Sequence, residues 1–399
     1  MQRDKETFIL YYDSVNNVLY DDSKKIMQIP IQQKMQWYGY CVQCVMGYSC
    51  NCNCKYCYQG EVKRKDIQGL PVKELANALN NHFNYTMNKL WRFEFCGGEP
   101  LMYFNQIKEL HKELQSNEYK PSEYMITTNG ILLTKEITEW LVENKIITTI
   151  SYDGEGQKEM RGNDLLNNRE IVALLRQLHE HNLLYFNIVI SNKNDDINRS
   201  LNKIQALLGY DDFLINSMRI VRIRSKESTS CALSDSQLKK YVNDVCNYAM
   251  QDGSRWRILR LRAYTFLSNL NNPVNGTVVT NGCTIANPMV VTMDIAGNIL
   301  RCYHSEASYE YKGIKNKIGH ISKSKHYEIQ KELNDKVMLL PDCKECLVKA
   351  LCFGGCVFCD DNIRKINCTH EYHTVLPTMI VALYAITKGK LIKIEKETP

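Results

Sequence analysis

The sequence predicts an α/β fold, a parallel sheet with helical crossovers, between two cysteine-rich segments. Across the middle of the 399 residues, short runs rich in Ile, Val, Phe, Tyr and Thr alternate with amphipathic helical patterns. This alternation is typical of βαβ units. The chain also has 17 cysteines, and most of them gather at 41–57 and 283–368, with Cys96, Cys231 and Cys246 between. We therefore expect an α/β body whose chemistry depends on the cysteines at its two ends.

Six strands and five intervening helices are predicted for the body. The strands are expected at 40–47, 91–96, 124–128, 147–152, 185–191 and 218–223. The helices are expected at 72–90, 105–115, 135–144, 169–182 and 197–208. In the fourth helix Ile171, Leu174, Leu175 and Leu178 share one face, which suits packing on a sheet. Crossovers of this length make the strands parallel, so functional residues should lie at their carboxyl ends.

The remaining segments predict smaller elements. We expect a helix at 234–250, a β-hairpin of 288–294 and 298–303 with Gly297 in its turn, and a closing helix at 376–387. An N-terminal hairpin either packs on the body or offers an edge strand to a peptide, and packing is favoured. The domains predicted are an extension 1–39, a core 40–232, a helical bridge 233–282, a cysteine-rich domain 283–375, and a helix and tail 376–399.

Composition excludes several classes of protein. The formal charge of +6 is too small for a nucleic-acid-binding surface. No run of about 18 apolar residues is available to span a membrane. The charged N-terminus leads into no apolar signal segment, so we expect a cytoplasmic protein, where disulfides do not persist. Clustered cysteines in a reducing compartment indicate metal or redox chemistry.

The first cysteine group has the spacing C-x3-C-x2-C at Cys50, Cys54 and Cys57. Three thiolates on one short loop can hold three irons of a [4Fe–4S] cluster and leave the fourth iron open. Cys52 could complete a four-cysteine zinc site, so this spacing alone leaves zinc open. Cys41 and Cys44 fall on opposite faces of the first strand and are expected to pack, as is Cys96.

Further motifs follow this loop in order. Tyr56 precedes Cys57, Gly97-Gly98-Glu99-Pro100 ends the second strand, 127–130 (TTNG) ends the third, 151–154 (SYDG) ends the fourth, and 187–192 resembles a fifth strand with a polar end. In this order the motifs resemble those of the radical S-adenosylmethionine (SAM) superfamily, over about residues 40–225. The superfamily's following arginine corresponds to Arg161, although the connecting stretch is about two residues shorter.

The resemblance implies a partial (β/α)6 barrel, a [4Fe–4S] cluster on Cys50, Cys54 and Cys57, and SAM on its open iron. Reductive cleavage of SAM would give a 5′-deoxyadenosyl radical that abstracts hydrogen, with an electron donor such as flavodoxin or ferredoxin. The SAM-binding residues implied are Tyr56, Gly97, Gly98, Glu99, Pro100, Ser151 and Arg161.

The second cysteine group has the spacing C-x13-G-x4-C, then C-x2-C-x5-C-x3-C, then C. It resembles the SPASM domain, which carries two auxiliary [4Fe–4S] clusters; a zinc ribbon is the alternative. The resemblance assigns Cys283, Cys302 and Cys356 to the first auxiliary cluster, and Cys343, Cys346, Cys352 and Cys368 to the second. The first lacks a ligand, which Cys231, Cys246, Cys359 or a non-cysteine group could supply. Cys359 could also replace Cys368.

SPASM-bearing relatives mostly modify peptides, so the leading hypothesis is a maturase that installs a C–C, C–O or thioether link in a ribosomal precursor peptide. A separate protein could bind the precursor's leader. An anaerobic sulfatase maturase is the nearest alternative, but those enzymes carry Asp where this chain has Tyr303. An iron–sulfur electron carrier or a zinc-stabilised binding protein is a third hypothesis. No catalytic acid or base is predicted, and His304 and His320 are expected at the surface or in packing.

Overall fold

The structure is a computed structural model that describes most of the chain. The described residues are 8–14, 16–21, 23–27, 40–59, 66–84, 91–252, 256–270, 285, 290–323, 343, 346–352, 356, 358–387 and 391–396. Cys283 lies outside them, as do 85–90 at the end of the first predicted helix. No helix in the described part is long and apolar enough to cross a membrane.

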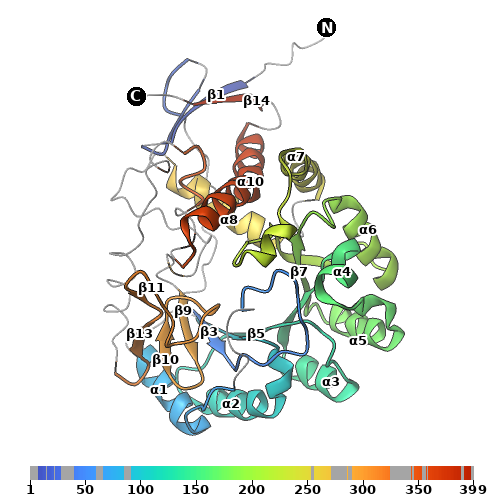
Figure 1. The fold of residues 1–399 in the computed structure, drawn as a ribbon, viewed down its shortest axis with the longest axis vertical. Coiled ribbons are helices and arrows are strands. Elements are labelled where there is room, and N and C mark those ends of the chain that lie inside the picture. The colour runs from blue at the N-terminus through green and yellow to red at the C-terminus, as the bar shows by residue number, and fades with distance from the viewer. Residues whose placement is uncertain are drawn as a thin grey trace.

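A nine-stranded sheet organises the body, in the order β13-β10-β9-β3-β4-β5-β6-β7-β8. The predicted strands of the body lie side by side and parallel in this sheet, as β3 (Tyr40–Val45), β4 (Trp91–Cys96), β5 (Glu123–Thr128), β6 (Ile146–Ser151), β7 (Leu184–Ile190) and β8 (Leu214–Ile220). Because the sheet does not close on itself in the described part of the chain, it is an open half barrel, as predicted (Figure 1).

Helices connect the parallel strands and cover the outer face of the sheet (Figure 1). They are α1 (Val72–Asn84), α2 (Phe104–Ser116), α3 (Lys135–Glu143), α4 (Gln157–Arg161), α5 (Arg169–Glu180) and α6 (Ile197–Leu208). Four of the predicted helices agree within about two residues, and the first agrees as far as its described part, which ends at Asn84; α4 was not predicted. Phe93, Phe95 and Phe186 are fully buried, and with Leu175 and Ile204 they belong to the main core between sheet and helices.

The predicted hairpin forms and widens the sheet. Strand β9 (Val290–Asp294) pairs in parallel with β3, and β10 (Asn298–Leu300) and β13 (Lys317–His320) follow in antiparallel order. Gly297 lies in the turn with φ +81°, a conformation that L side chains rarely adopt. Short strands β11 (Glu310–Tyr311) and β12 (Ile314–Lys315) form a separate pair. The cysteine-rich segment is therefore joined to the barrel sheet itself.

The closing helix begins much earlier than predicted. Helix α10 runs from Asp361 to Ile386, so the boundary drawn at 375/376 falls within it. Asp360 caps its N-terminus by accepting hydrogen bonds from the Asn362 and Ile363 amides. Few apolar residues mark its first half, because that half presents polar side chains to the sheet.

Those polar side chains cover the open edge after β8. Thr374 accepts from the Ile220 amide at 3.2 Å, His370 lies 2.8 Å from the Val221 carbonyl, and Asn367 bonds both backbone groups of Ile223. Their i, i+3, i+7 spacing puts them on one helix face. We predicted a strand at 218–223, but residues 221–223 bond largely to a helix, and β8 begins and ends earlier.

The two chain ends share a small sheet packed on two helices. Strand β1 (Phe8–Asp13) lies between β2 (Val18–Tyr20) and β14 (Leu391–Lys396). Tyr12 packs edge-on against Phe266 of α8 (Arg257–Asn269), in a core shared with Val375 and Met379 of α10. Helix α7 (Asp235–Asp252) corresponds to the predicted helix at 234–250. The N-terminal hairpin therefore packs, as favoured, with β1 paired on both sides.

Candidate active site

The loop after β3 carries the first cysteine group and is bonded to the end of β4. The Gly98 amide donates to the Gly47 carbonyl, and the Glu99 amide to the Ser49 carbonyl, both at 2.9 Å. A Cβ on Gly98 would lie 2.3 Å from the Ser49 oxygen, and one on Gly97 (φ +136°) 2.4 Å from the Gly47 oxygen. Gly97 and Gly98 were predicted to contact a ligand. Here their lack of a side chain lets the backbone of the cysteine loop pack against the end of β4.

Glu99 ties three segments together. Its carboxylate is 1% exposed and accepts from the Leu101 amide at 3.0 Å, the Thr128 hydroxyl at 2.6 Å and the Asn129 amide at 2.8 Å. Burial raises the pKa of Glu99 to about 7, against the lowering effect of these donors. Pro100 is buried in the short helix Pro100–Tyr103 that follows. Asn129 then donates to Asn51 at 2.7 Å, which joins the end of β5 to the cysteine loop.

A buried aspartate that the sequence argument did not single out joins two predicted site residues. Asp153 is 0% exposed and accepts from the Arg161 Nε at 2.8 Å, the Val189 amide at 3.0 Å and the Tyr56 hydroxyl. The guanidinium of Arg161 also lies 5.5 Å from the centre of the Tyr56 ring. Ser151 ends β6 opposite Asn187, just before this group. The sequence could have pointed to Asp153 only through its place in the 151–154 (SYDG) motif.

The thiols of the loop lie in a cationic setting. Arg161 Nη1 is 4.0 Å from the Cys54 sulfur, and the Cys52 thiol hydrogen-bonds to both Cys50 and Cys54. The Cys52 hydrogen bond and, less strongly, Arg161 lower the pKa of Cys54 to about 7, against the effect of burial. Cys50, Cys54 and Cys57 remain partly accessible whereas Cys52 is buried. Three partly accessible sulfurs on one loop, beside a guanidinium, are what an iron–sulfur cluster requires of its ligands, so this donor set fits one.

Four of the C-terminal cysteines surround one pocket. Cys343, Cys346, Cys352 and Cys368 line it together with Val348, Lys349 and Tyr372. In the described part of the chain, no three His, Cys, Asp or Glu side chains are placed to bind a single metal ion. One zinc ion needs its four ligands within about 2.3 Å of a point, whereas a cluster spreads them over different irons. Four sulfurs around a cavity therefore fit a cluster.

Cys356, another of the C-terminal cysteines, is linked to the first loop by side-chain contacts. Arg224 Nη1 is 3.0 Å from the Cys356 sulfur, and its Nη2 is 2.9 Å from His304 Nδ1. The His304 ring is 7% exposed and stacks on Tyr58 with centroids 3.7 Å apart, so it packs inside the site rather than at the surface. Tyr58 follows Cys57 directly. The side chains of Arg224, His304 and Tyr58 thus connect the two cysteine groups.

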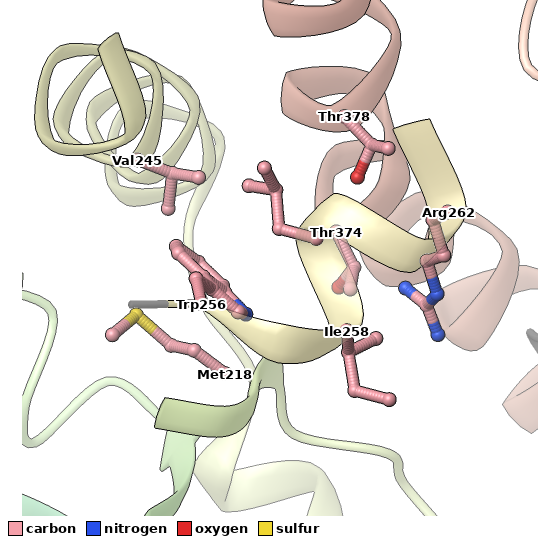
Figure 2. A pocket seen from close by; sticks show the side chains of 8 residues that line it. Met218, Val245, Trp256, Ile258, Arg262, Thr374 and Thr378 are labelled. Carbon is pink, nitrogen blue, oxygen red and sulfur yellow. The ribbon is translucent and has the colours of Figure 1, made fainter. Parts of the chain in front are cut away.

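Three arginines cluster around Glu371 of α10, close to the contact between Arg224 and His304. Glu371 accepts from Arg219 at 2.9 Å and Arg222 at 3.1 Å. Burial alone would raise the pKa of Glu371, but Arg222, Arg219 and Arg262 hold it to about 2. Figure 2 shows Arg262 projecting from α8 beside Thr374 and Thr378 of α10, around a pocket that also reaches Met218 and Trp256. Three arginines around one carboxylate give this end of the barrel a net positive charge.

The inner face of the half barrel carries polar side chains at the level of the strands. Gln43 donates to Glu94 at 2.9 Å, and Thr127 donates to the other Glu94 oxygen at 3.0 Å. The three residues come from β3, β4 and β5 and are partly accessible. A cysteine loop at the carboxyl edge of a parallel half barrel, above a polar inner face, is the arrangement expected of an iron–sulfur enzyme.

Comparison with known proteins agrees with this class. Residues 44–204 match the Radical SAM superfamily. The chain is 25% identical over 203 residues to the radical SAM cyclopropyl synthase TigE of Paramaledivibacter caminithermalis, covering 46% of this chain and 42% of that protein. It is 24% identical over 348 residues to a cysteine-type anaerobic sulfatase-maturating enzyme of Clostridium perfringens, covering 78% and 87%. The chain thus spans less than half the length of TigE.

Two solved structures share the fold. Native anSMEcpe with bound AdoMet and the Cp18Cys peptide has a TM-score of 0.64 at 17% identity, covering 88% of this chain and 98% of that one. Streptococcus suis SuiB bound to its precursor peptide SuiA has a TM-score of 0.56 at 16% identity, covering 80% and 72%. Residues 44–204 belong to the radical SAM superfamily, and the chain is an enzyme related to peptide-modifying and sulfatase-maturating enzymes. Membership implies a [4Fe–4S] cluster and SAM.

Proposed function

We propose that this enzyme is a radical SAM/SPASM peptide maturase of the cytoplasm, which abstracts hydrogen from a ribosomally made precursor peptide and installs an oxidative crosslink. It would carry two auxiliary clusters besides the SAM cluster and take its electron from a flavodoxin or ferredoxin. A separate protein could present the precursor by its leader. The structures that share its fold include one with a precursor peptide and one with another peptide bound, which supports a peptide substrate.

The contact between the two cysteine groups carries the proposal. The stack of His304 on Tyr58 joins the turn after Cys302 to the residue after Cys57, at 3.7 Å between ring centroids. Arg224 continues this contact to Cys356. An oxidative crosslink needs an acceptor for the electron that the substrate radical gives up. C-terminal clusters held this close to the SAM loop could accept it.

The protein's own side chains would position the reactants. The bound cluster and SAM would together supply a hydrogen-abstracting radical. Arg161, fixed by the buried carboxylate of Asp153, provides a positive charge beside Cys54. The polar inner face formed by Gln43, Glu94 and Thr127 offers donors and acceptors to a peptide backbone. The covering helices exclude water from the other side of the sheet.

Formylglycine formation is a second candidate, because a sulfatase-maturating relative aligns over 87% of its own length. Tyr303 argues against it. A phenol occupies the position of the carboxylate expected in that group, and its ring contacts Tyr58 and His304 edge-on. Burial is the main cause that raises the pKa of Tyr303, so at neutral pH it stays a phenol and not a base.

One experiment separates the two candidates. The reconstituted enzyme is incubated without oxygen with SAM, dithionite and either the Cp18Cys peptide or synthetic peptides encoded by short reading frames beside the gene. We expect 5′-deoxyadenosine in each case, a crosslinked product from a neighbouring precursor, and no aldehyde in Cp18Cys. An aldehyde trapped by a hydrazine reagent would instead establish the formylglycine activity.

A further inference from the structure

We propose that Cys359 is the missing protein ligand of the first auxiliary cluster. This inference rests on the proposed function, which includes that cluster. The SPASM resemblance supplies only Cys283, Cys302 and Cys356, and it leaves open whether Cys359 belongs with them or with the second cluster. The positions of the described cysteines favour the first cluster.

The second cluster is complete without Cys359. Its four expected ligands line one pocket, and Cys368 reaches that pocket from α10. Cys359 is 5% exposed and is not among the residues that line this pocket. Instead its sulfur is 3.8 Å from the Asn367 side-chain amide, which also bonds the Ile223 backbone after β8. The sulfurs of Cys359 and Cys368 therefore belong to different surroundings.

Cys359 lies with Cys356. The Cys359 thiol donates a hydrogen bond to the Cys356 sulfur. Arg224 Nη1 lies 3.0 Å from the Cys356 sulfur and 3.7 Å from the Cys359 sulfur. The C-x2-C spacing of the two is one that iron–sulfur proteins use to place two thiolates on one cluster. A guanidinium shared by both sulfurs is suited to stabilising two thiolates together.

The same arginine extends the site toward Cys302. Its Nη2 bonds to His304 Nδ1 at 2.9 Å, and His304 is two residues beyond Cys302. Asn316 fixes the intervening turn by bonding the Cys302 amide and carbonyl, both at 3.0 Å. Among the described residues, none accepts a hydrogen bond from the buried Nε2 of His304. An orphaned donor at the edge of this group is consistent with an acceptor, such as a cluster sulfide, beside it.

The two other cysteines that could supply the ligand have different neighbours. Cys231 lies beside Lys55, Glu159 and Lys193, near the first cysteine loop. Cys246 is buried on α7, and no charged group among the described residues perturbs its thiol. Neither shares Arg224. These two positions provide matched controls, since each is a buried cysteine that alanine can replace.

The test counts iron and identifies clusters in the full-length protein reconstituted without oxygen. The wild type should bind about twelve irons, in three clusters. Cys359→Ala and Cys359→Ser should lose about one iron per chain and show the electron paramagnetic resonance signal of a three-iron cluster when oxidised. Cys231→Ala and Cys246→Ala should match the wild type. Wild-type iron content and spectra in both Cys359 variants would overturn the proposal.

A second variant tests whether a cluster lies beside this pair of sulfurs if the Cys359 variants do not fold. Removing the cation beside both sulfurs with Arg224→Gln should make one auxiliary cluster harder to reduce, so its midpoint potential falls while the other two stay unchanged. Unchanged potentials for all clusters would overturn the assignment. A wild type that binds only about four irons would be recognised before any variant is made, and it would refute the auxiliary clusters of the proposed function themselves.

Discussion

The two cysteine groups hold their sulfurs in different ways. In the first, the sulfurs come from one loop of eight residues, which backbone hydrogen bonds fasten to the end of β4 and a side-chain bond between Asn129 and Asn51 fastens to the end of β5. In the second, they come from the turn after β10, the 346–352 segment and helix α10, far apart in the sequence. The first arrangement depends on local geometry, and the second depends on the tertiary structure of the whole C-terminal half.

The largest effect is expected from Cys54→Ala, which tests whether the local group works as a unit. Removing one of three ligands should lower 5′-deoxyadenosine formation more than about 100-fold, since even outer partners of metal ligands are worth about 10–100-fold. Liquid chromatography of the anaerobic reaction measures it. Cys52→Ala, a buried cysteine in the same loop, should retain activity; equal loss in both variants would show that the loop needs all its thiols.

A smaller effect on SAM cleavage is expected from Cys346→Ala, which removes a sulfur from the second group. About one iron or more per chain should be lost, while part of the 5′-deoxyadenosine formation remains, because the SAM loop keeps its own contacts. Formation of the crosslinked product should end. Lys349→Ala, which changes the same pocket without removing a sulfur, is the control. Full product yield from Cys346→Ala would contradict an essential second auxiliary cluster.

The buried carboxylate under the first group is tested by Asp153→Asn. The amide cannot balance Arg161, and breaking a buried ion pair by changing one partner costs about 3–5 kcal/mol of unfolding free energy. Urea unfolding followed by tryptophan fluorescence measures the loss. Glu155→Gln, at an exposed pair with Arg199, should cost under about 1 kcal/mol. Equal losses of unfolding free energy in the two variants would mean that the buried ion pair of Asp153 with Arg161 stabilises the protein no more than the exposed pair does.

The smallest effect is expected from Glu371→Gln, and it depends on pH. The pKa of Glu371 is lowered to about 2, so its ion pairs stabilise the fold fully above the unfolded value of 4.5. This contribution is lost as the pH falls from there toward 2. The variant should be less stable by about 3 kcal/mol at neutral pH and by about 1 kcal/mol near pH 3, and the difference should vanish only below pH 2. A difference that does not change with pH would refute the ion-pair explanation.

The sequence predicted the first group better than the second for a physical reason. Strand 91–96 and helix 197–208 follow local periodicity, and the loop motifs have fixed spacing, so neither depends on distant residues. Asp153 was visible as part of a motif, but its contacts to Tyr56 and Val189 were not. The pairing of Cys356 with Arg224 joins residues 132 apart in the sequence. The early start of α10 was missed because its polar face is buried against the backbone after β8.

That polar face has a consequence for how the protein is assembled. Helix α10 protects the last strand edge of the barrel with Asn367 and Thr374, and between them it carries Cys368 into the four-cysteine pocket. Iron delivered to that pocket would fasten the helix in place, and the helix would then shield the edge from pairing with other chains. With the auxiliary cluster proposed above, iron starvation would leave the newly made chain prone to aggregation as well as inactive, and one helix would couple cofactor supply to solubility.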